Sequence, residues 1–121
     1  EKSVMETVQQ KQSVCFAAEK AGHLLGYLLV YHAADEAEIA RIAVQKEARR
    51  QGAAGKLMQA LEHYCEEHKM EKLLLDVRES NEAARSFYTK NGFVEDGIRQ
   101  GFYTNPSEDA VLMSRQLGAD V

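Results

Sequence analysis

The sequence predicts one α/β domain whose sheet is mixed and mostly antiparallel. Three observations lead to this prediction: three apolar segments separated by short polar turns, a glycine-containing turn that opens into an amphipathic helix, and a second helix with apolar segments on both sides. At 121 residues the chain is long enough to bury one core. Because no repeat, linker or low-complexity segment divides it, residues 1–121 are expected to fold as a single domain.

The first part of the chain is expected to begin with a helix and to continue as strands. Residues 1–11 are polar with three spaced apolar side chains, which indicates a short amphipathic helix. Segments 13–18, 24–32 and 38–44 are predicted strands. The turns between these strands are short and polar, so the strands are expected to form an antiparallel meander.

A helix is predicted from about Leu57, after a polar connection over residues 45–48 and a turn of small residues. Its apolar side chains have the spacing of a helix that lies on a core, and they are Leu57, Met58, Leu61 and Cys65. The sequence therefore predicts a strand, a tight turn and a helix in direct succession.

The last part of the chain predicts a buried strand over 72–78, a helix over about 81–90, and strands over 93–99 and 110–116. Residue Ser80 or Asn81 can cap the start of the second helix with its side-chain oxygen.

Beyond this helix, Asn91-Gly92 offers a left-handed stop before Phe93. The loop between the last two strands holds Pro106, the single proline of the sequence. Together these elements predict a strand–helix–strand crossover at the centre of the sheet.

Composition narrows the classes of function. The net charge of −4 gives no general attraction to nucleic acid, and no apolar run approaches the roughly 18 residues of a membrane span. The N-terminus has no signal-peptide pattern. Cys15 and Cys65 fall in a predicted strand and on a predicted helix face, so they are expected to be free, buried thiols in a cytoplasmic protein. The four histidines have no metal-ligand spacing, and no metal is expected.

The turn before the first long helix has the composition of an anion-binding site. It reads Arg49-Arg50-Gln51-Gly52-Ala53-Ala54-Gly55-Lys56. The N–H groups of a first helical turn have no acceptors within the helix, and glycines let another group approach the backbone closely. Three basic side chains add charge beside the positive end of the helix. We therefore expect this turn, defined here as the anion cradle, to bind a phosphate or pyrophosphate.

Two common phosphate motifs do not fit the cradle. A P-loop requires Gly at position 50 and Ser or Thr at position 57, where Arg50 and Leu57 stand. The dinucleotide-binding fingerprint does not fit either, because the cradle sequence lacks the first pair of glycines that it requires. The pattern R/Q-x-x-G-x-G/A does fit, as Arg49, Gly52 and Ala54 after a strand. In this the chain resembles the acetyl-coenzyme A site of the GNAT family of N-acetyltransferases.

A second set of motifs narrows the resemblance. Segments 74–81, 87–88, 91–93, 99–103 and 108–110 look like those of the ribosomal-protein N-terminal alanine acetyltransferases, the RimI-like branch of the family. The resemblance covers roughly residues 38–117. It implies transfer of an acetyl group from acetyl-coenzyme A, without a metal, to a protein N-terminus.

The same resemblance implies a role for each matching residue. It implies that a strand end and the cradle, with one residue of the second helix, contact the cofactor: Ile42, Ala43, Val44, Arg49, Arg50, Gln51, Gly52, Ala53, Ala54, Gly55, Lys56 and Asn81. Asp76 stands where the family has its general-base glutamate, and Tyr88 where it has its general-acid tyrosine. Phe102 and Tyr103 would border the acceptor on a loop. The family pattern there is two tyrosines, so Phe102 lacks a hydroxyl.

These residue types suit acetyl transfer to an amine by direct attack in a ternary complex. An α-amino group has a pKa of about 7.7–8 against about 10.4 for lysine, a gap worth about 3.4 kcal/mol. A carboxylate that acts through a bridging water, as the shorter Asp76 would, therefore suffices more easily for an N-terminus. Tyr88 could protonate the departing thiolate.

The resemblance also implies a fold in which two central parallel strands splay apart, with helices on both faces of the sheet. The family begins with one more strand and further helices, so the N-terminal strand is expected to be missing here. Segment 13–18 would then be an exposed edge, open to pairing with another chain. Whether the protein is a monomer or a dimer stays open.

Alternative interpretations remain for several residues and for the function. Asp76 and Arg78 could form an ion pair at the sheet end, Tyr88 could only pack, and Arg49 and Arg50 could be a solvated run. A small-molecule amine could be the acceptor in place of a protein N-terminus. A coenzyme A-binding module without catalysis is the alternative from another class.

Overall fold

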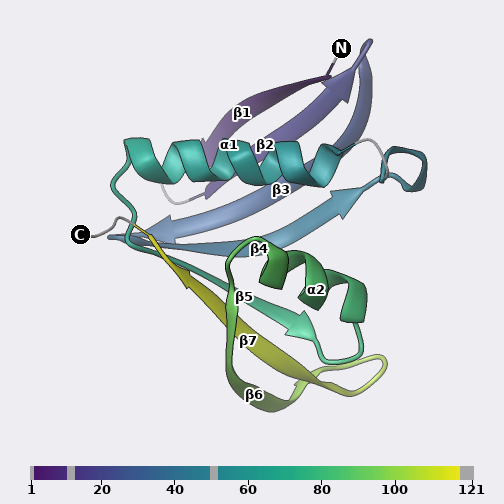
Figure 1. Ribbon diagram of the computed structural model, residues 1–121, viewed down its shortest axis with the longest axis vertical. Helices are drawn as coiled ribbons and strands as arrows, with labels where there is room; N and C mark the ends of the chain where they lie inside the picture. Colours follow the sequence, from purple (N-terminus) through teal and green to yellow (C-terminus); the bar gives the residue numbers. More distant parts are fainter. Residues whose placement is uncertain (1, 11–12, 50–51, 118–121) are drawn as a thin grey trace.

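The computed structural model describes residues 2–10, 13–49 and 52–117, and these form one seven-stranded sheet with two α-helices. The strand order is β1-β2-β3-β4-β5-β7-β6, and every neighbouring pair is antiparallel except the parallel pair β4 and β5. Figure 1 shows the two helices lying across the strands. In chain order the elements are β1 (Lys2–Gln10), β2 (Ser13–Lys20), β3 (His23–Ala33), β4 (Glu36–Val44), the 3-10 turn η1 (Lys46–Ala48), α1 (Ala53–Glu67), β5 (Lys72–Arg78), α2 (Glu82–Lys90), β6 (Val94–Tyr103) and β7 (Glu108–Gln116).

The N-terminal segment is a strand, so the prediction of a helix over residues 1–11 is wrong. Strand β1 pairs with β2 along its length, and the ladder sets Val4 opposite Ala18 and Val8 opposite Val14. A spacing of four residues is compatible with a strand as well as a helix, and pairing in the sheet decides between them. The expectation of a missing strand beside β2 is wrong for the same reason, because β1 covers the edge that β2 would otherwise expose.

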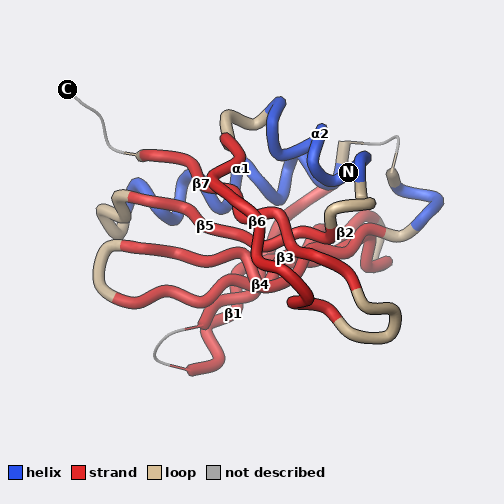
Figure 2. Tube along the Cα trace, turned by 90° about the horizontal axis from the view of Figure 1, so that it is seen from below, coloured by secondary structure: helices blue, strands red, loops and turns tan. Residues whose placement is uncertain are grey.

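The helices lie on one face of the sheet rather than on both. Figure 2 shows α1 and α2 on the same side of the strands. Arg115 of β7 links them, because its guanidinium bonds to Glu62 of α1 and to the main-chain oxygen of Asn91 at the end of α2. The prediction of helices on both faces is therefore wrong for the part of the chain that the structure describes.

The core lies between this face of the sheet and the two helices. Strand β5 alternates between buried and half-buried side chains, as expected for a strand with one face against helices. The four apolar positions predicted for the first long helix are all buried: Leu57, Met58, Leu61 and Cys65. At about 25 cal/mol per Å² of apolar surface, this face of α1 supplies most of the free energy that holds the helix to the sheet.

The parallel strands β4 and β5 pair only over their first residues. The ladder runs from Glu36 opposite Lys72 to Ile39 opposite Leu75 and then ends. At this point Ala40 is an extra residue in β4, where the register with β3 shifts from Ile39 to Arg41. Such a bulge bends and twists a strand. Beyond it β4 pairs only with β3 and β5 only with β7, which confirms the predicted splayed parallel pair.

The two ends of α2 follow the predicted capping residues. The side-chain oxygen of Asn81 accepts a hydrogen bond from the amide of Ala84 at 3.1 Å. At the other end Gly92 has a φ of +90°, and the amide of Phe93 donates to the carbonyl of Tyr88. This is a Schellman motif, in which a left-handed glycine ends the helix and turns the chain back.

Candidate functional site

The N-terminus of α1 presents main-chain N–H groups without helical acceptors. Gly52 precedes the helix with a φ of +77°, a left-handed conformation that glycine adopts without a steric cost. Among the described residues no side chain caps this end, and no acidic residue lies in the first turn. The amides of Ala53, Ala54 and Gly55 therefore remain available to an anion at the positive end of the helix dipole.

The helix begins at Ala53, four residues before the predicted start, so Gly55 and Lys56 belong to its first turn. A Cβ built on Gly55 would meet no atom within 4 Å, which indicates open space beside the cradle. Lys56 is exposed. The predicted cradle residues Arg50 and Gln51 lie outside the described residues.

Arg49 is exposed and bonds to the end of β4. Its Nε donates to the carbonyl oxygen of Val44 at 3.3 Å. This contact ties the guanidinium to the strand end that precedes the cradle, which a freely solvated side chain would not do. The predicted contact residues Ile42, Ala43 and Val44 are half-buried and lie on the part of β4 that has left β5. Their main-chain groups have no ladder to β5.

Electrostatic interactions link Tyr103 with two other ionisable groups in the second half of the chain. Burial raises the pKa of Tyr103, and the carboxylate of Asp76 raises it further. Tyr103 in turn contributes to the raised pKa of Tyr88. The structure therefore brings together residues from β5, α2 and the end of β6. We call Asp76, Tyr88 and Tyr103 the ionisable cluster.

Tyr88 is buried and its hydroxyl has no hydrogen-bond partner among the described residues. Only 4% of the residue is exposed, and its ring packs edge-on against Phe87 and Phe93, with centroids 5.4 Å away in each case. Burial is the main reason that its pKa rises to about 12. The phenol is therefore protonated at neutral pH. A buried hydroxyl without a partner costs free energy, so this one is a candidate for contact with a ligand.

The carboxylate of Asp76 is half-buried and makes no hydrogen bond or ion pair within the described ranges. Its neighbour on the same strand face, Arg78, pairs with Glu108 instead, at 3.2 Å. The alternative in which Asp76 serves as the ion-pair partner of Arg78 is therefore not supported. Hydrogen bonds from Ser80, with a smaller contribution from Arg78, lower the pKa of Glu108.

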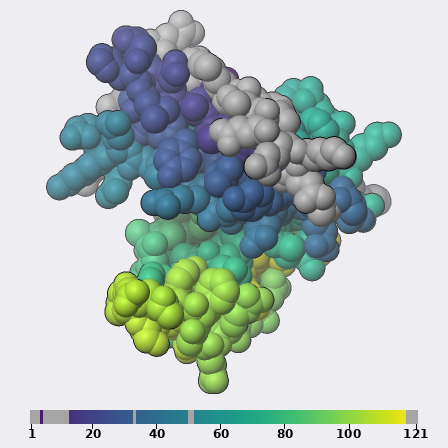
Figure 3. Space-filling view, turned by 180° about the vertical axis from the view of Figure 1, so that it is seen from behind, coloured from purple at the N-terminus to yellow at the C-terminus, as the bar shows by residue number. Residues whose placement is uncertain are grey.

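Phe102 and Tyr103 end strand β6 rather than lying in a loop as predicted. Phe102 is 41% exposed, and Arg99 lies over its ring at 4.9 Å. The two aromatic rings meet edge-on at 5.0 Å. In the view from behind, the β6–β7 hairpin forms a separate lobe below the N-terminal strands (Figure 3). Asn81 uses its amide oxygen as the cap of α2 and stays exposed beside this region.

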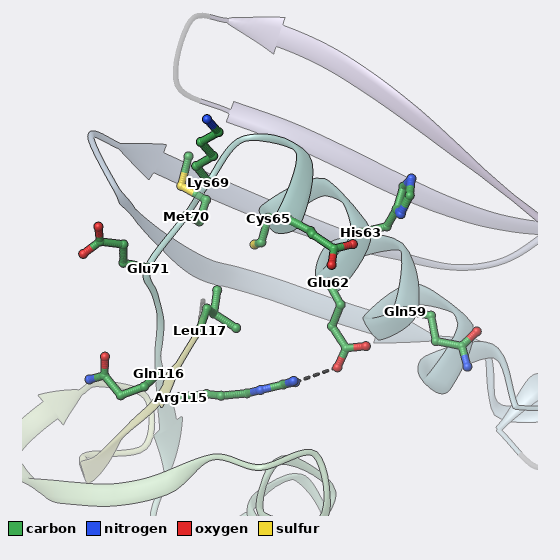
Figure 4. Close-up of a pocket in the computed structure, with 11 residues that line it drawn as sticks. Gln59, Glu62, His63, Cys65, Lys69, Met70, Glu71, Arg115, Gln116 and Leu117 are labelled. Carbon is green, nitrogen blue, oxygen red and sulfur yellow. Dashed lines mark hydrogen bonds and ion pairs between the residues drawn. The ribbon is translucent and has the colours of Figure 1, made fainter. Parts of the chain in front are cut away.

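A hollow of about 810 Å³ lies at the other end of α1 and contains none of the predicted site residues. Figure 4 shows the Glu62–Arg115 ion pair, with an N–O distance of 2.6 Å, and Cys65 among its walls. Cys65 is a free thiol, and burial raises its pKa to about 11. A thiol that stays protonated is a poor nucleophile, which agrees with the prediction of a core cysteine.

Before any sequence relative is considered, the fold defines a class: an α/β protein in which a helix begins with a left-handed glycine close to the point where a parallel strand pair splays. The model of the acetyltransferase (GNAT) family matches residues 2–93. The chain belongs to this family.

Two of the proteins similar to this chain are named as ribosomal-protein alanine N-acetyltransferases. A Bacillus subtilis (strain 168) protein named "putative ribosomal protein bS18-alanine N-acetyltransferase" is 39% identical over 95 residues, which are 78% of this chain and 63% of that protein. The crystal structure of the ribosomal-protein-S18-alanine N-acetyltransferase from Escherichia coli has a TM-score of 0.85 and 30% identity, over 93% of this chain and 74% of the other.

A GNAT acetyltransferase from Elizabethkingia anophelis with acetyl-CoA bound has a TM-score of 0.80. It is 21% identical, over 88% of this chain and 77% of the other, and so shares the fold. The chain spans somewhat less than two thirds of the Bacillus relative's length. Among the described residues, neither helix is long and apolar enough to cross a membrane.

Proposed function

We propose that this domain binds acetyl-coenzyme A and transfers its acetyl group to the α-amino group of a protein N-terminus. The observation that carries the proposal is the run of amides at Ala53, Ala54 and Gly55, which have no acceptor in the helix and no side-chain cap among the described residues, and which follow the strand that leaves its parallel partner. A diphosphate is the natural ligand of such a helix end. The end of β4, which has no ladder to β5, would then hold the extended pantetheine arm through main-chain hydrogen bonds.

The ionisable cluster would supply the proton transfers. Asp76 has no ion pair within the described residues, so its carboxylate can accept a proton from the incoming amine through a water molecule. Tyr88 is buried and protonated, and its hydroxyl has no hydrogen-bond partner in the part of the chain that the structure describes; this is the state required of a group that protonates a leaving thiolate. Tyr103 interacts electrostatically with both residues and would line the approach of the acceptor.

A protein N-terminus is favoured as the acceptor for a chemical reason. An α-amino group is roughly a tenth neutral at pH 7, whereas a lysine side chain is almost wholly charged. A carboxylate that works through water is adequate for the first and weak for the second. The names of the Bacillus and Escherichia coli relatives point to the N-terminal alanine of a ribosomal protein.

The test is an acetylation assay with matched acceptors. One peptide begins with a free alanine, a second has a blocked N-terminus and one lysine, and a panel of small amines follows. We expect modification of the free N-terminus alone, located by mass spectrometry. Transfer chiefly to small amines would replace the protein acceptor by a small molecule. Coenzyme A binding without any transfer would reduce the domain to a binding module.

A further inference from the structure

The guanidinium of Arg78 holds the turn between β6 and β7 by several contacts. Its Nη1 donates to the carbonyl oxygen of Pro106 at 3.1 Å, and its Nη2 donates to the carbonyl oxygen of Thr104 at 3.3 Å. The same Nη1 pairs with the carboxylate of Glu108 at 3.2 Å. One side chain at the end of β5 therefore binds three residues of the hairpin, across a sequence separation of about thirty residues.

The same guanidinium also lies over an aromatic ring of the hairpin. The central carbon of Arg78 is 4.4 Å from the ring centroid of Tyr103. This is the geometry of a cation–π contact, which fixes the ring as well as attracting it. Tyr103 is the member of the ionisable cluster that interacts electrostatically with each of the other two.

Glu108 continues the link back to the start of α2. Its second carboxylate oxygen accepts a hydrogen bond from the main-chain amide of Ser80 at 2.5 Å. Ser80 directly precedes Asn81, the cap of α2. A main-chain bond from the amide of Glu79 to the carbonyl of Asp109 joins the same two segments. The end of β5, the start of α2 and the β6–β7 hairpin are thus bound together around Arg78.

We propose that Arg78 is the positioning residue of the acetyl-transfer site, which it serves by fixing Tyr103 and the β6–β7 hairpin against β5. This inference rests on the proposed function. Arg78 itself does not take part in the chemistry. Arg78 lies on β5 with Asp76, and it sets the distance and angle of Tyr103 relative to that carboxylate. It also fixes the β6–β7 hairpin, which the acceptor must pass.

The arrangement needs an arginine rather than a cation in general. The guanidinium of Arg78 is planar and has donors in fixed directions. It binds two carbonyl oxygens, one carboxylate and one aromatic face. A lysine ammonium can satisfy one or two of these partners and cannot stack on the ring with the same geometry. The conservative replacement is therefore expected to lose most of the positioning effect while it keeps the charge.

The variants Arg78→Met and Arg78→Lys test the proposal, with Arg115→Met as the matched control. Arg115 is a fair match because its side chain is 28% exposed against 31% for Arg78, and it also bonds a glutamate and a carbonyl. For Arg78→Met we expect kcat/KM for the alanine-led peptide to fall about 10- to 100-fold, since a displacement of about 1 Å can cost that much. The Kd for coenzyme A should stay within about twofold, because the cradle is untouched.

Amide hydrogen exchange supplies a measurement that does not depend on catalysis. Without the guanidinium, the amides of residues 101–109 should exchange roughly tenfold faster or more, while those of β2 and β3 keep their rates. Arg78→Lys should show the same changes to a lesser degree, and it serves if Arg78→Met does not fold. Arg115→Met should show neither the loss of kcat/KM nor the faster exchange.

Normal kcat/KM and normal exchange in both Arg78 variants would overturn the proposal, and so would losses equal to those of Arg115→Met. If the unaltered protein transfers no acetyl group to any amine, the proposed function fails instead. In that case faster exchange at 101–109 would still assign Arg78 to the hairpin, and unchanged exchange would remove that role as well.

Discussion

The anion cradle and the ionisable cluster are built by different means. The cradle consists of main-chain amides within a few residues of one another, where a left-handed glycine opens α1. The ionisable cluster is made of side chains from β5, α2 and β6, brought together by the sheet. The first depends on local backbone conformation, and the second depends on contacts between distant segments.

Because the two sites are built differently, substitutions in the cradle and in the ionisable cluster should have different effects on the protein. A change in the cradle should weaken the binding of the acetyl donor and leave the turnover of bound substrate nearly intact. A change in the ionisable cluster should do the reverse.

Replacing the buried phenol should give the largest change. Tyr88→Phe removes one hydroxyl that has no hydrogen-bond partner among the described residues, so the fold should hold. We expect kcat to fall by about 10²- to 10⁴-fold, the usual contribution of a general acid, while coenzyme A affinity stays the same. Steady-state kinetics and calorimetry measure the two quantities.

Tyr64→Phe is the control for this experiment. Tyr64 is also a buried tyrosine, but its hydroxyl lies 2.8 Å from Nε2 of His32. Its removal should lower stability and leave kcat unchanged. Full turnover in Tyr88→Phe would remove Tyr88 from the mechanism and leave it as a packing residue.

Distorting the cradle should give the second largest change. Gly52→Val places a β-branched residue at a φ of +77°, a strain of about 1–3 kcal/mol that the chain can relieve by rotating the amides away from the ligand. We expect the Kd for coenzyme A to rise roughly tenfold or more, since about 1.4 kcal/mol corresponds to tenfold.

Gly22→Val is the matched control, because Gly22 has a φ of +82° in the turn between β2 and β3 and open space around its Cβ position. It carries the same kind of backbone strain outside the cradle. Equal losses of coenzyme A affinity in both variants would mean that strain alone, and not the cradle, explains the result.

The raised pKa of Tyr88 predicts a change at alkaline pH. The sequence has five tyrosines, and the ultraviolet absorbance of the folded protein should show one phenol that ionises only near pH 12. Because the folded pKa lies above the unfolded value of 10, the contribution to stability is complete below pH 10 and is lost as the pH rises toward 12. In Tyr88→Phe this last absorbance step should be absent; its persistence would assign the high pKa to another tyrosine.

The smallest expected effect concerns Glu108. Hydrogen bonds from Ser80 and the charge of Arg78 lower the pKa of Glu108 from its usual 4.5. Its contribution to stability is therefore present above pH 4.5 and is lost as the pH falls through the lower, folded value. Glu108→Gln should slightly lower the urea midpoint at pH 7 and flatten its decline between pH 5 and pH 3, relative to the unaltered protein. An identical pH profile in both proteins would contradict the assignment.

Local sequence patterns were sufficient to predict those elements whose residues are compatible with only one type of secondary structure. The strand Lys72–Arg78 was predicted with its observed ends, because a run of apolar residues is bounded there by polar ones. The stop after α2 followed from Asn91-Gly92. The start of α1 was placed too late, because small residues at positions 53–55 carry no apolar periodicity even though they are helical.

Other features depend on information that local patterns do not contain. Whether residues 2–10 form a helix or a strand depends on β2 as a pairing partner. The contact between Arg78 and Glu108 joins residues thirty positions apart and has no local signal. Asp76 and Tyr88 were predicted from the resemblance to the GNAT family, and the structure adds that both interact electrostatically with Tyr103.

The most direct test is a calorimetric titration that compares coenzyme A with pantetheine, which lacks the diphosphate and the nucleotide. If the amides at the start of α1 hold the diphosphate, coenzyme A should bind with measurable heat, and pantetheine should bind at least roughly a hundredfold more weakly. A folded sample that gives no heat with coenzyme A, or that binds both compounds equally, would contradict the account.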